Sequence, residues 1–298
     1  MNPQGDLSNP PAVEPAHAGR RFLNVGCGSN FHSDWLNVDV VPASAAVMAV
    51  DIRKGLPFAD EVFDAVYCSH VLEHFPRPEA ASLLRNMCRV LRAGGVIRVV
   101  VPDLETLARE YLRLLDQLKR EPNAAAADYD WIVLEMYDQA VRDRIGGEAS
   151  SFLAAPDLPN RDFVLSRIGA EAERAWQASQ TPVVSRLLDR IRARGLGWLL
   201  KAVRVRGAGL LIGLLGGRTA RAAYLEGVFR QSGEVHRWMY DSFSLGRALK
   251  DAGFVNVRRC SAFESAVPGF ASYALDVDER KRVRKPDSLF MEAERPRA

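Results

Sequence analysis

Residues 23–30 read LNVGCGSN, an apolar strand that runs directly into a Gly-x-Gly turn. Open α/β sheets bind nucleotide-like ligands at such a turn, beyond the end of the first strand. Gly26 and Gly28 suit this position because a residue without a Cβ atom lets the backbone approach a ligand closely. A dinucleotide-binding turn would have a third glycine near position 31 and an acid about 20 residues further on. Position 31 is a phenylalanine, and the acid Asp39 follows Gly26 by only 13 residues. The pattern therefore does not favour NAD as the ligand.

Short apolar segments alternate with a helical pattern after this turn. Residues 35–41 (WLNVDVV) and 62–70 (VFDAVYCSH) are typical of strands, and residues 96–103 (VIRVVVPD) form a β-branched run of the kind found in buried parallel sheets. Residues 78–91 carry apolar side chains at helical spacing, and the RAGG that follows is expected to cap this helix. The alternation predicts a parallel sheet with right-handed crossovers.

The strand pattern disappears between residues 106 and 234, where four stretches show apolar residues at i, i+3 and i+4. The alternation of helix and strand resumes after the insert, with a helix predicted over residues 244–254 and strands over 255–260 and 288–295. We therefore predict a core interrupted by a helical insert that acts as a lid. The predicted domains are a disordered leader (1–18), a core (19–105 and 235–298) and the insert (106–234).

Composition narrows the class of protein. Lys and Arg number 40 against 37 acids, and a net charge of +3 is too small to indicate nucleic acid as a partner. The four cysteines are scattered without a C-x-x-C pair, which suits a reducing compartment. The first 18 residues lack a signal-peptide pattern, and no apolar run reaches the roughly 18 to 20 residues that span a bilayer. The sequence predicts a cytoplasmic protein.

Five motifs in order make the pattern more specific. LNVGCGSN, NVDV, DIRKGLPFADEVFDAVYCSHVLEHF, LRAGGVIRVVVPD and the terminal LKDAGFVNV…SLFMEAER together resemble a class I S-adenosylmethionine-dependent methyltransferase. The chain is most similar to the small-molecule branch, in which the fourth strand runs into VLEH. The resemblance covers about residues 21–105 and 235–295. It implies an α/β, Rossmann-like fold with a seven-stranded, mostly parallel sheet, helices on both faces and a large helical insert, with S-adenosylmethionine as cofactor.

The resemblance also implies which residues bind the cofactor. Asp39 would accept both ribose hydroxyls, since a carboxylate has two oxygens. Asn24 stands where the family often has an acid, and brings no charge to the cofactor's ammonium group. Asp51 would lie near the adenine amine; the alternative is that it only caps a short turn before Gly55. The predicted cofactor-binding residues are Asn24, Gly26, Gly28, Asp39, Asp51, Ile52 and Ser69.

Residues 70–74 (HVLEH) match H-x-x-E-H, the pattern of inverted zinc peptidases. Such a zinc site needs a sustained helix that projects both histidines from one face. Here the motif follows a strand directly, and Pro76 and Pro78 leave room for about one turn. We therefore predict no metal, and a polar rim in its place. A zinc hydrolase remains one alternative, and a non-catalytic binding protein, suggested by Asn24 and Asn30, is another.

Methyl transfer to a hydroxyl group requires alignment and a base. Histidine suits this role because its unperturbed pKa leaves it mostly neutral at pH 7. The two candidate catalytic residues are His70, at the end of the fourth strand, and His236 in GEVHRWMYD. Around His236 the alternative is a packed hinge with Trp238 and Tyr240 in the core. We expect a small-molecule acceptor methylated on oxygen, such as a sugar or a lipid-linked glycan.

Residues 181–230 contain ten Lys or Arg and two acids, a local charge of +8, among many leucines. A basic amphipathic segment is typical of a helix on anionic lipid, here the inner face of the membrane. The other interpretation is a solvated basic face whose apolar side covers the active site or a partner subunit in a homodimer. The sequence leaves both open.

Overall fold

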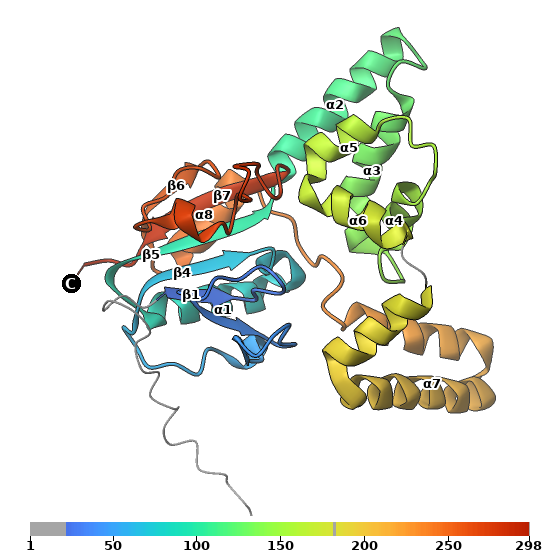
Figure 1. Ribbon diagram of the computed structural model, residues 1–298, viewed down its shortest axis with the longest axis horizontal. Helices are drawn as coiled ribbons and strands as arrows, with labels where there is room; N and C mark the ends of the chain where they lie inside the picture. The colour runs from blue at the N-terminus through green and yellow to red at the C-terminus, as the bar shows by residue number, and fades with distance from the viewer. Residues whose placement is uncertain (1–21, 181–182, 298) are drawn as a thin grey trace, which may run out of the picture. The chain divides into compact units, whose positions relative to one another are not determined.

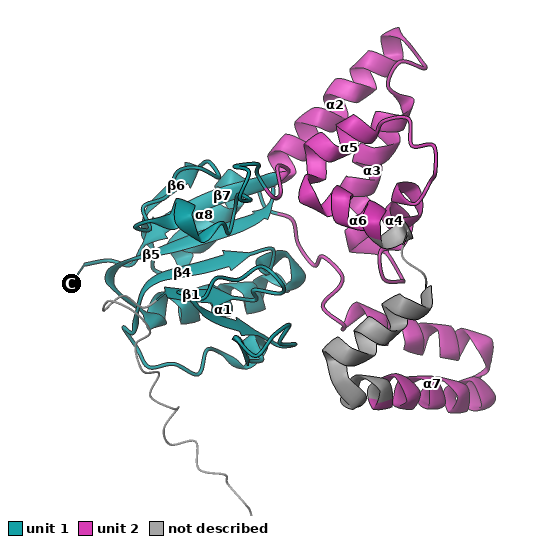
Figure 2. Ribbon diagram, viewed as in Figure 1, with its two compact units in different colours: residues 1–102, 240–283, 288–298 teal, residues 103–239, 284–287 magenta. Residues whose placement is uncertain are grey.

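The computed structural model describes residues 22–180 and 183–297, with the side chains of residues 178–199 and 201 left out. The predicted leader lies outside this range. The chain divides into two compact units (Figure 2). The first unit contains residues up to 102, 240–283 and 288–298, and the second contains residues 103–239 and 284–287. Each unit is described on its own below.

A seven-stranded sheet with the order β3-β2-β1-β4-β5-β7-β6 forms the first unit (Figure 1). The first five strands pair in parallel, and β7 pairs antiparallel with both β5 and β6. This arrangement confirms the predicted α/β fold with a seven-stranded, mostly parallel sheet. Helices were predicted on both faces, but in the described residues of this unit α-helices cover only one. The strands are β1 (Phe22–Val25), β2 (Leu36–Asp39), β3 (Val47–Ala49), β4 (Phe63–Ser69), β5 (Leu91–Pro102), β6 (Val255–Cys260) and β7 (Ser288–Glu294).

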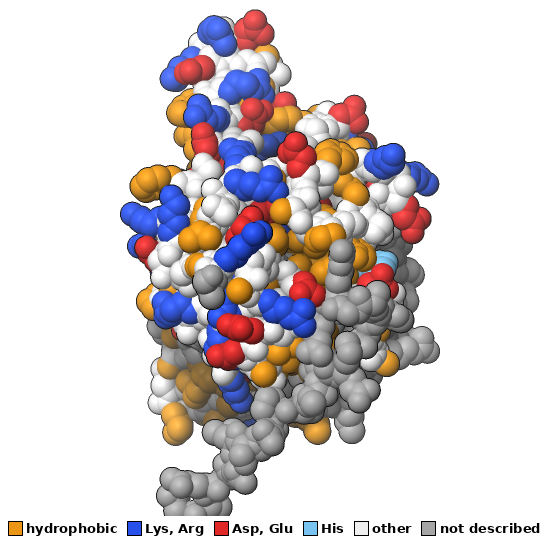
Figure 3. All heavy atoms as spheres, turned by 90° about the vertical axis from the view of Figure 1, so that its left-hand side faces the viewer, with side chains coloured by type: hydrophobic (Ala, Val, Ile, Leu, Met, Phe, Trp, Pro, Cys, Tyr) orange, Lys and Arg blue, Asp and Glu red, His pale blue; other side chains and the backbone are white. Residues whose placement is uncertain are grey.

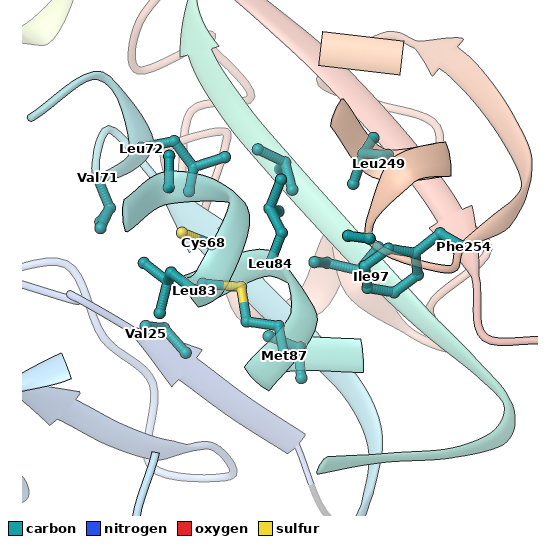
Figure 4. Close-up of a cluster of buried hydrophobic side chains, with 14 of the residues drawn as sticks. Val25, Cys68, Val71, Leu72, Leu83, Leu84, Met87, Ile97, Leu249 and Phe254 are labelled. Carbon is teal, nitrogen blue, oxygen red and sulfur yellow. The ribbon is translucent and has the colours of Figure 1, made fainter. Parts of the chain in front are cut away.

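Two helices, α1 (Arg77–Val90) and α8 (Ser242–Asp251), cover one face of this sheet and share a buried apolar cluster with it (Figure 4). The sequence of α1 explains its packing, because Leu83, Leu84 and Met87 recur at helical spacing and are buried. Each such side chain contributes about 1.5 to 3 kcal/mol when fully buried. This cluster holds the central strands, whose ends carry the candidate site.

The opposite face has a separate buried cluster that includes Trp35, Tyr67 and Phe270. It is covered by the segment 262–277, which contains the short 3₁₀ helix η3 (Phe270–Tyr273), and no α-helix of the described chain contributes to it. The connections from β1 to β2 and from β2 to β3 also lack an α-helix. The aromatic rings of this face take the place of helices as its covering layer.

One local prediction is wrong. RAGG (92–95) does not cap a helix, because α1 ends at Val90 and β5 begins at Leu91. The backbone of Gly94 and Gly95 pairs with Arg295 beyond β7, and the register with β4 shifts between Phe63 and Ala65. Long-range pairing therefore makes this segment a bulged strand.

The second unit is helical, as predicted. One of the four stretches with helical spacing, residues 161–177, forms two helices because Gly169 (φ 51°) divides it into α5 and α6. None of the described helices is long and apolar enough to cross a bilayer. The helices are α2 (Leu104–Arg120), α3 (Ala126–Val141), α4 (Gly147–Leu153), α5 (Arg161–Ile168), α6 (Ala170–Gln180) and α7 (Val183–Arg230).

Charges on the face shown in Figure 3 are mixed. Basic and acidic side chains lie interspersed there and do not gather by sign. This pattern accords with the small net charge of the whole chain.

Candidate active site

The turn after β1 contains two glycines in the left-handed region, and their surroundings differ. Gly26 (φ 67°) donates its N–H to the carbonyl of Val38 at 2.8 Å, and a Cβ atom added to it would lie 2.5 Å from Val71 Cγ2. Gly28 (φ 54°) has no atom within 4 Å of the equivalent position. Gly26 is therefore required by packing, whereas the space beside Gly28 is clear of protein atoms.

The Asp39 carboxylate lies directly beside this turn. One of its oxygens accepts the N–H of Gly28 at 2.9 Å, and the other accepts the N–H of Val41 at 2.9 Å. A carboxylate offers about four lone-pair positions, so two remain for a ligand. The structure thus places two of the predicted cofactor-binding residues, Gly28 and Asp39, next to each other with acceptor capacity left over. Their contact with the cofactor stays a prediction.

Asn24 lies buried beneath the turn. Its amide nitrogen donates to the Asn30 carbonyl and to Asn37 Oδ1, both at 3.1 Å. Asn37 in turn donates to the Trp35 carbonyl at 2.7 Å. These bonds join β1, β2 and the turn, which gives Asn24 a supporting role. Its contact with the cofactor stays a prediction.

Asp51 is the N-cap of the 3₁₀ helix η1 (Ile52–Lys54) and accepts the N–H of Arg53. Both of its oxygens also bind the Arg53 guanidinium, at 2.8 and 2.9 Å. The hydrogen bond from this side chain lowers the pKa of Asp51. The capping alternative thus describes what Asp51 does here, and the adenine contacts of Asp51 and Ile52 stay predictions.

His70 follows Ser69 at the end of β4 in a left-handed conformation (φ 53°), and its N–H donates to the Val100 carbonyl at 2.8 Å. Its ring joins two polar side chains. Nδ1 lies 3.2 Å from Glu73 Oε1, and Nε2 lies 2.9 Å from Ser288 Oγ. A non-glycine residue with positive φ is uncommon and often marks a functional position. The backbone therefore directs this imidazole from the strand end.

Glu73 lies beside the His70 ring at ion-pair distance, although the two side chains are not in hydrogen-bond geometry. The Glu73 side chain is completely buried, and that of His70 is 14% exposed. A carboxylate hydrogen-bonded to Nδ1 would favour the tautomer that has its proton on that nitrogen, with Nε2 as an acceptor. Nearby, burial raises the pKa of Tyr240 to about 12, and the Glu73 charge adds to this. Tyr240 belongs to the apolar core, as the alternative interpretation of its segment proposed.

The H-x-x-E-H motif does not form the helix that a zinc peptidase needs. Leu72–His74 make one 3₁₀ turn, η2, and α1 begins only after Pro76. This matches the single turn expected from the flanking prolines. The absence of a metal requirement stays a prediction.

His236, the second candidate base, belongs to the second unit. It is buried and its N–H donates to the Gln139 carbonyl at 2.9 Å. Trp238 is 41% exposed, so it does not join a core as the hinge interpretation proposed. The catalytic role of His236 stays a prediction.

Ser288 was not predicted as a site residue, because its position depends on the direction of β7 in the sheet. It is the first residue of β7 and lies opposite Pro102 at the end of β5. An antiparallel strand begins at the edge where its parallel neighbours end, so the start of β7 meets the end of β4. The strand direction was the missing information.

The sequence also gave no sign of a buried ionic network centred on Arg98. Its guanidinium binds Asp276 Oδ2 at 2.6 Å and Glu292 Oε1 at 2.9 Å, and all three side chains are almost fully buried. Tyr67 donates its hydroxyl to Asp276 at 2.6 Å. A single Arg in a β-branched run does not reveal its partners, which lie far away in sequence.

The cysteines are expected to be unreactive in the folded protein. Burial, with the nearby Asp39 charge, raises the pKa of Cys27 to about 12, and burial also raises the pKa of the other three thiols (Cys68, Cys88 and Cys260). Because the thiolate is the reactive form, labelling by DTNB at about pH 8 should be at least roughly a hundredfold slower in native than in urea-unfolded protein. This prediction would be contradicted if one thiol per native chain reacted rapidly with DTNB and this rapid reaction were absent in Cys27→Ser.

Residues 23–99 match the family described as a methyltransferase domain. The match shows a methyltransferase domain in this segment, which confirms for these residues the predicted enzyme class and S-adenosylmethionine as the cofactor. The predicted domain bounds stay a prediction. A probable methyltransferase, ltbC, of Aspergillus luteorubrus is 37% identical over 57 residues, which are 19% of this chain and 20% of the relative. The alignment thus spans about a fifth of the length of that curated relative.

Solved structures of similar proteins include two methyltransferases. One is a putative methyltransferase in complex with the Trm112 activator from Haloferax volcanii (10% identity, 95% of this chain and 85% of that one, TM-score 0.37). The other is CalS10, an amino pentose methyltransferase from Micromonospora echinaspora (22% identity, 27% and 42%, TM-score 0.23).

Proposed function

We propose that the whole chain is an S-adenosylmethionine-dependent methyltransferase that methylates an oxygen of a small-molecule acceptor. The observation that carries the proposal is the turn at residues 26–28. The space beside Gly28, where a Cβ atom would point, is clear of protein atoms, and the Asp39 carboxylate with spare acceptor positions lies next to it. A ribose with two hydroxyls and no phosphate fits this combination.

The residues around the turn fit the cofactor, which would supply an electrophilic methyl group when bound. Gly26 and Gly28 would line its methionyl and ribose portions, and Asp39 would accept the ribose hydroxyls. Asp51 and Ile52 would flank the adenine, with Asp51 shared between this ring and Arg53. Ser69 would face the sulfonium end, and Asn24 would hold the turn in place from below.

His70 is the proposed base. Glu73 would keep the proton on Nδ1, so that Nε2 accepts the hydroxyl proton of the acceptor as the new bond to carbon forms. Because the sulfur of the bound cofactor would be uncharged after methyl transfer, these residues would have no leaving-group charge to stabilise. This arrangement favours a hydroxyl acceptor, which needs a base. A sugar or a lipid-linked glycan is the acceptor class that we propose.

Calorimetric titration with S-adenosylmethionine tests the cofactor site. Asp39→Ala should weaken binding by about 2 to 4 kcal/mol, roughly thirtyfold to several hundredfold, because charge-assisted hydrogen bonds contribute about 1.5 to 3 kcal/mol each. Asp60→Ala is the matched control, since it removes one exposed carboxylate that pairs only with Arg89 among the described contacts. It should leave the affinity unchanged. Equal affinity of Asp39→Ala and the unmodified protein would refute the assignment.

A further inference from the structure

Helix α7 reverses its direction at Gly217, which has a φ of 79°. Residues equally distant from Gly217 lie side by side. A Cβ atom on Gly209 would lie 3.4 Å from Leu225 Cδ2, and one on Gly213 would lie 3.2 Å from Arg221 Cδ. Residues 202–230 therefore form a hairpin of two antiparallel helical arms (Figure 1). We call this segment the α7 hairpin.

The two arms approach closely because the first arm presents glycines to the second. Gly209 and Gly213 are four residues apart, the spacing that allows helix backbones to pack against each other. Gly209 is buried in this contact. The larger apolar side chains of the first arm must then point elsewhere.

Those side chains form an exposed apolar face. Val203, Leu210 and Leu214 are spaced by seven and four residues and so share one side of the helix. Leu214 is 82% exposed, and the adjoining Leu215 is 90% exposed. In a helix surrounded by water this side would be polar. The face, which we call the leucine face, consists of Val203, Leu210, Leu211, Leu214 and Leu215 of the hairpin and of Leu200 just before it, each more than half exposed.

Exposed arginines accompany the leucine face in the sequence. Arg204 and Arg206 are exposed on the same arm, and Arg218 and Arg221 are exposed at the start of the second arm. The sequence from 201 to 225 contains no acid. Arginine has a long apolar stem, so it can extend from an apolar layer toward phosphate groups. Leucines bordered by arginines are complementary to the surface of an anionic bilayer.

We propose that the leucine face of the α7 hairpin binds the surface of an anionic lipid bilayer, with the first arm lying in the interface. The charge distribution favours lipid over a second copy of the chain. In a symmetric dimer formed through this face, the arginines of one copy would approach those of the other, and like charges repel. Lipid phosphates would neutralise the same arginines. The proposal does not depend on the methyltransferase activity.

Vesicle sedimentation tests it with the full chain. The protein should pellet with vesicles of phosphatidylcholine and phosphatidylglycerol at low salt, and hardly at all with phosphatidylcholine alone. Salt at about 0.5 M should reduce the bound fraction, because it screens the attraction to phosphates. No cofactor or acceptor is needed, so the result is independent of catalysis.

Two variants separate the apolar and the charged contributions. Leu214→Ser with Leu215→Ser should weaken binding by about tenfold or more, since each inserted leucine contributes strongly. Its matched control is Leu112→Ser with Val141→Ser, which changes two exposed residues on α2 and α3.

Arg204→Gln with Arg206→Gln should weaken binding roughly thirtyfold. Its control is Arg109→Gln with Lys119→Gln, two exposed side chains of α2.

Controls that bind as well as the unmodified protein would support the proposal. Circular dichroism should show that all four variants are folded, since they alter exposed side chains. No pelleting with anionic vesicles at low salt would overturn it. A dimer in sedimentation velocity that is lost in Leu214→Ser with Leu215→Ser, without vesicle binding, would also overturn it and assign the face to a second copy.

Discussion

Replacing His70 by asparagine should lower kcat by about a hundredfold to ten-thousandfold, the range in which a positioned general base contributes. Asparagine is the suitable replacement because it tolerates the left-handed backbone that His70 adopts. The loss follows from removal of Nε2, the acceptor that Glu73 would orient through Nδ1. The measurement is transfer of tritiated methyl groups from S-adenosylmethionine to the acceptor fraction that the unmodified protein labels.

Three further variants make this result specific. Glu73→Gln should also lower kcat, since an amide does not hold the Nδ1 proton as a carboxylate does. His32→Asn changes a partly exposed imidazole of the same unit and should leave kcat unchanged. Affinity for S-adenosylmethionine should be unaltered in all of them. If His236→Asn abolishes turnover while His70→Asn retains it, the base is His236.

Arg98→Met should lower the free energy of unfolding by about 3 to 5 kcal/mol, the cost of leaving buried charges without their partner. Asp276 and Glu292 would both lose the guanidinium that lies between them. Arg258→Met is the matched control. Arg258 also binds Glu292, but it is half exposed, and such pairs contribute at most about 1 kcal/mol. Urea unfolding followed by circular dichroism gives both values, and similar stability of the two variants would contradict the network's importance.

The effect of Arg98→Met should also depend on pH. Burial raises the pKa of Glu292, but hydrogen bonds from Ser265 and Ala266 and the Arg98 charge outweigh it and hold the pKa below its usual value. Its contribution to stability is therefore present above the unfolded-state pKa and is lost as pH falls through the folded-state pKa. Burial raises the pKa of Asp276 despite Arg98. The ionisation of Asp276 therefore lowers the free energy of unfolding as pH rises from its unfolded-state pKa to its folded-state pKa, which is the opposite of the effect of Glu292. Without Arg98 both acids protonate more readily, and the destabilisation should shrink in acid.

The sequence predicts the sheet well because its signals are local. Runs such as 96–101 are apolar enough to indicate buried strands, and the Gly-x-Gly turn identifies the end of the first of them. The proximity of Gly28 and Asp39 follows from two adjacent parallel strands. The ends of the helices are harder to predict from the sequence. Gly169 divides a continuous apolar pattern, and pairing with Arg295 makes RAGG part of a strand.

Contacts between distant segments could not be predicted in this way. Ser288 reaches His70 only because β7 runs antiparallel at the right register. The partners of Arg98 lie within residues 260–292, so its own strand gives no information about them. The reversal of α7 is also hidden, since Gly217 is one of several glycines in a helical pattern.

The position of β7 has a consequence for synthesis on the ribosome. This strand pairs with β5, yet residues 103–287 are translated between them. At about 5 to 20 residues per second, the apolar edge of β5 stays open for roughly 10 to 40 seconds after it emerges. An open apolar edge can pair with strands of other chains. The nascent chain is therefore exposed to aggregation for most of its translation, and a chaperone that covers strand edges would act during that interval.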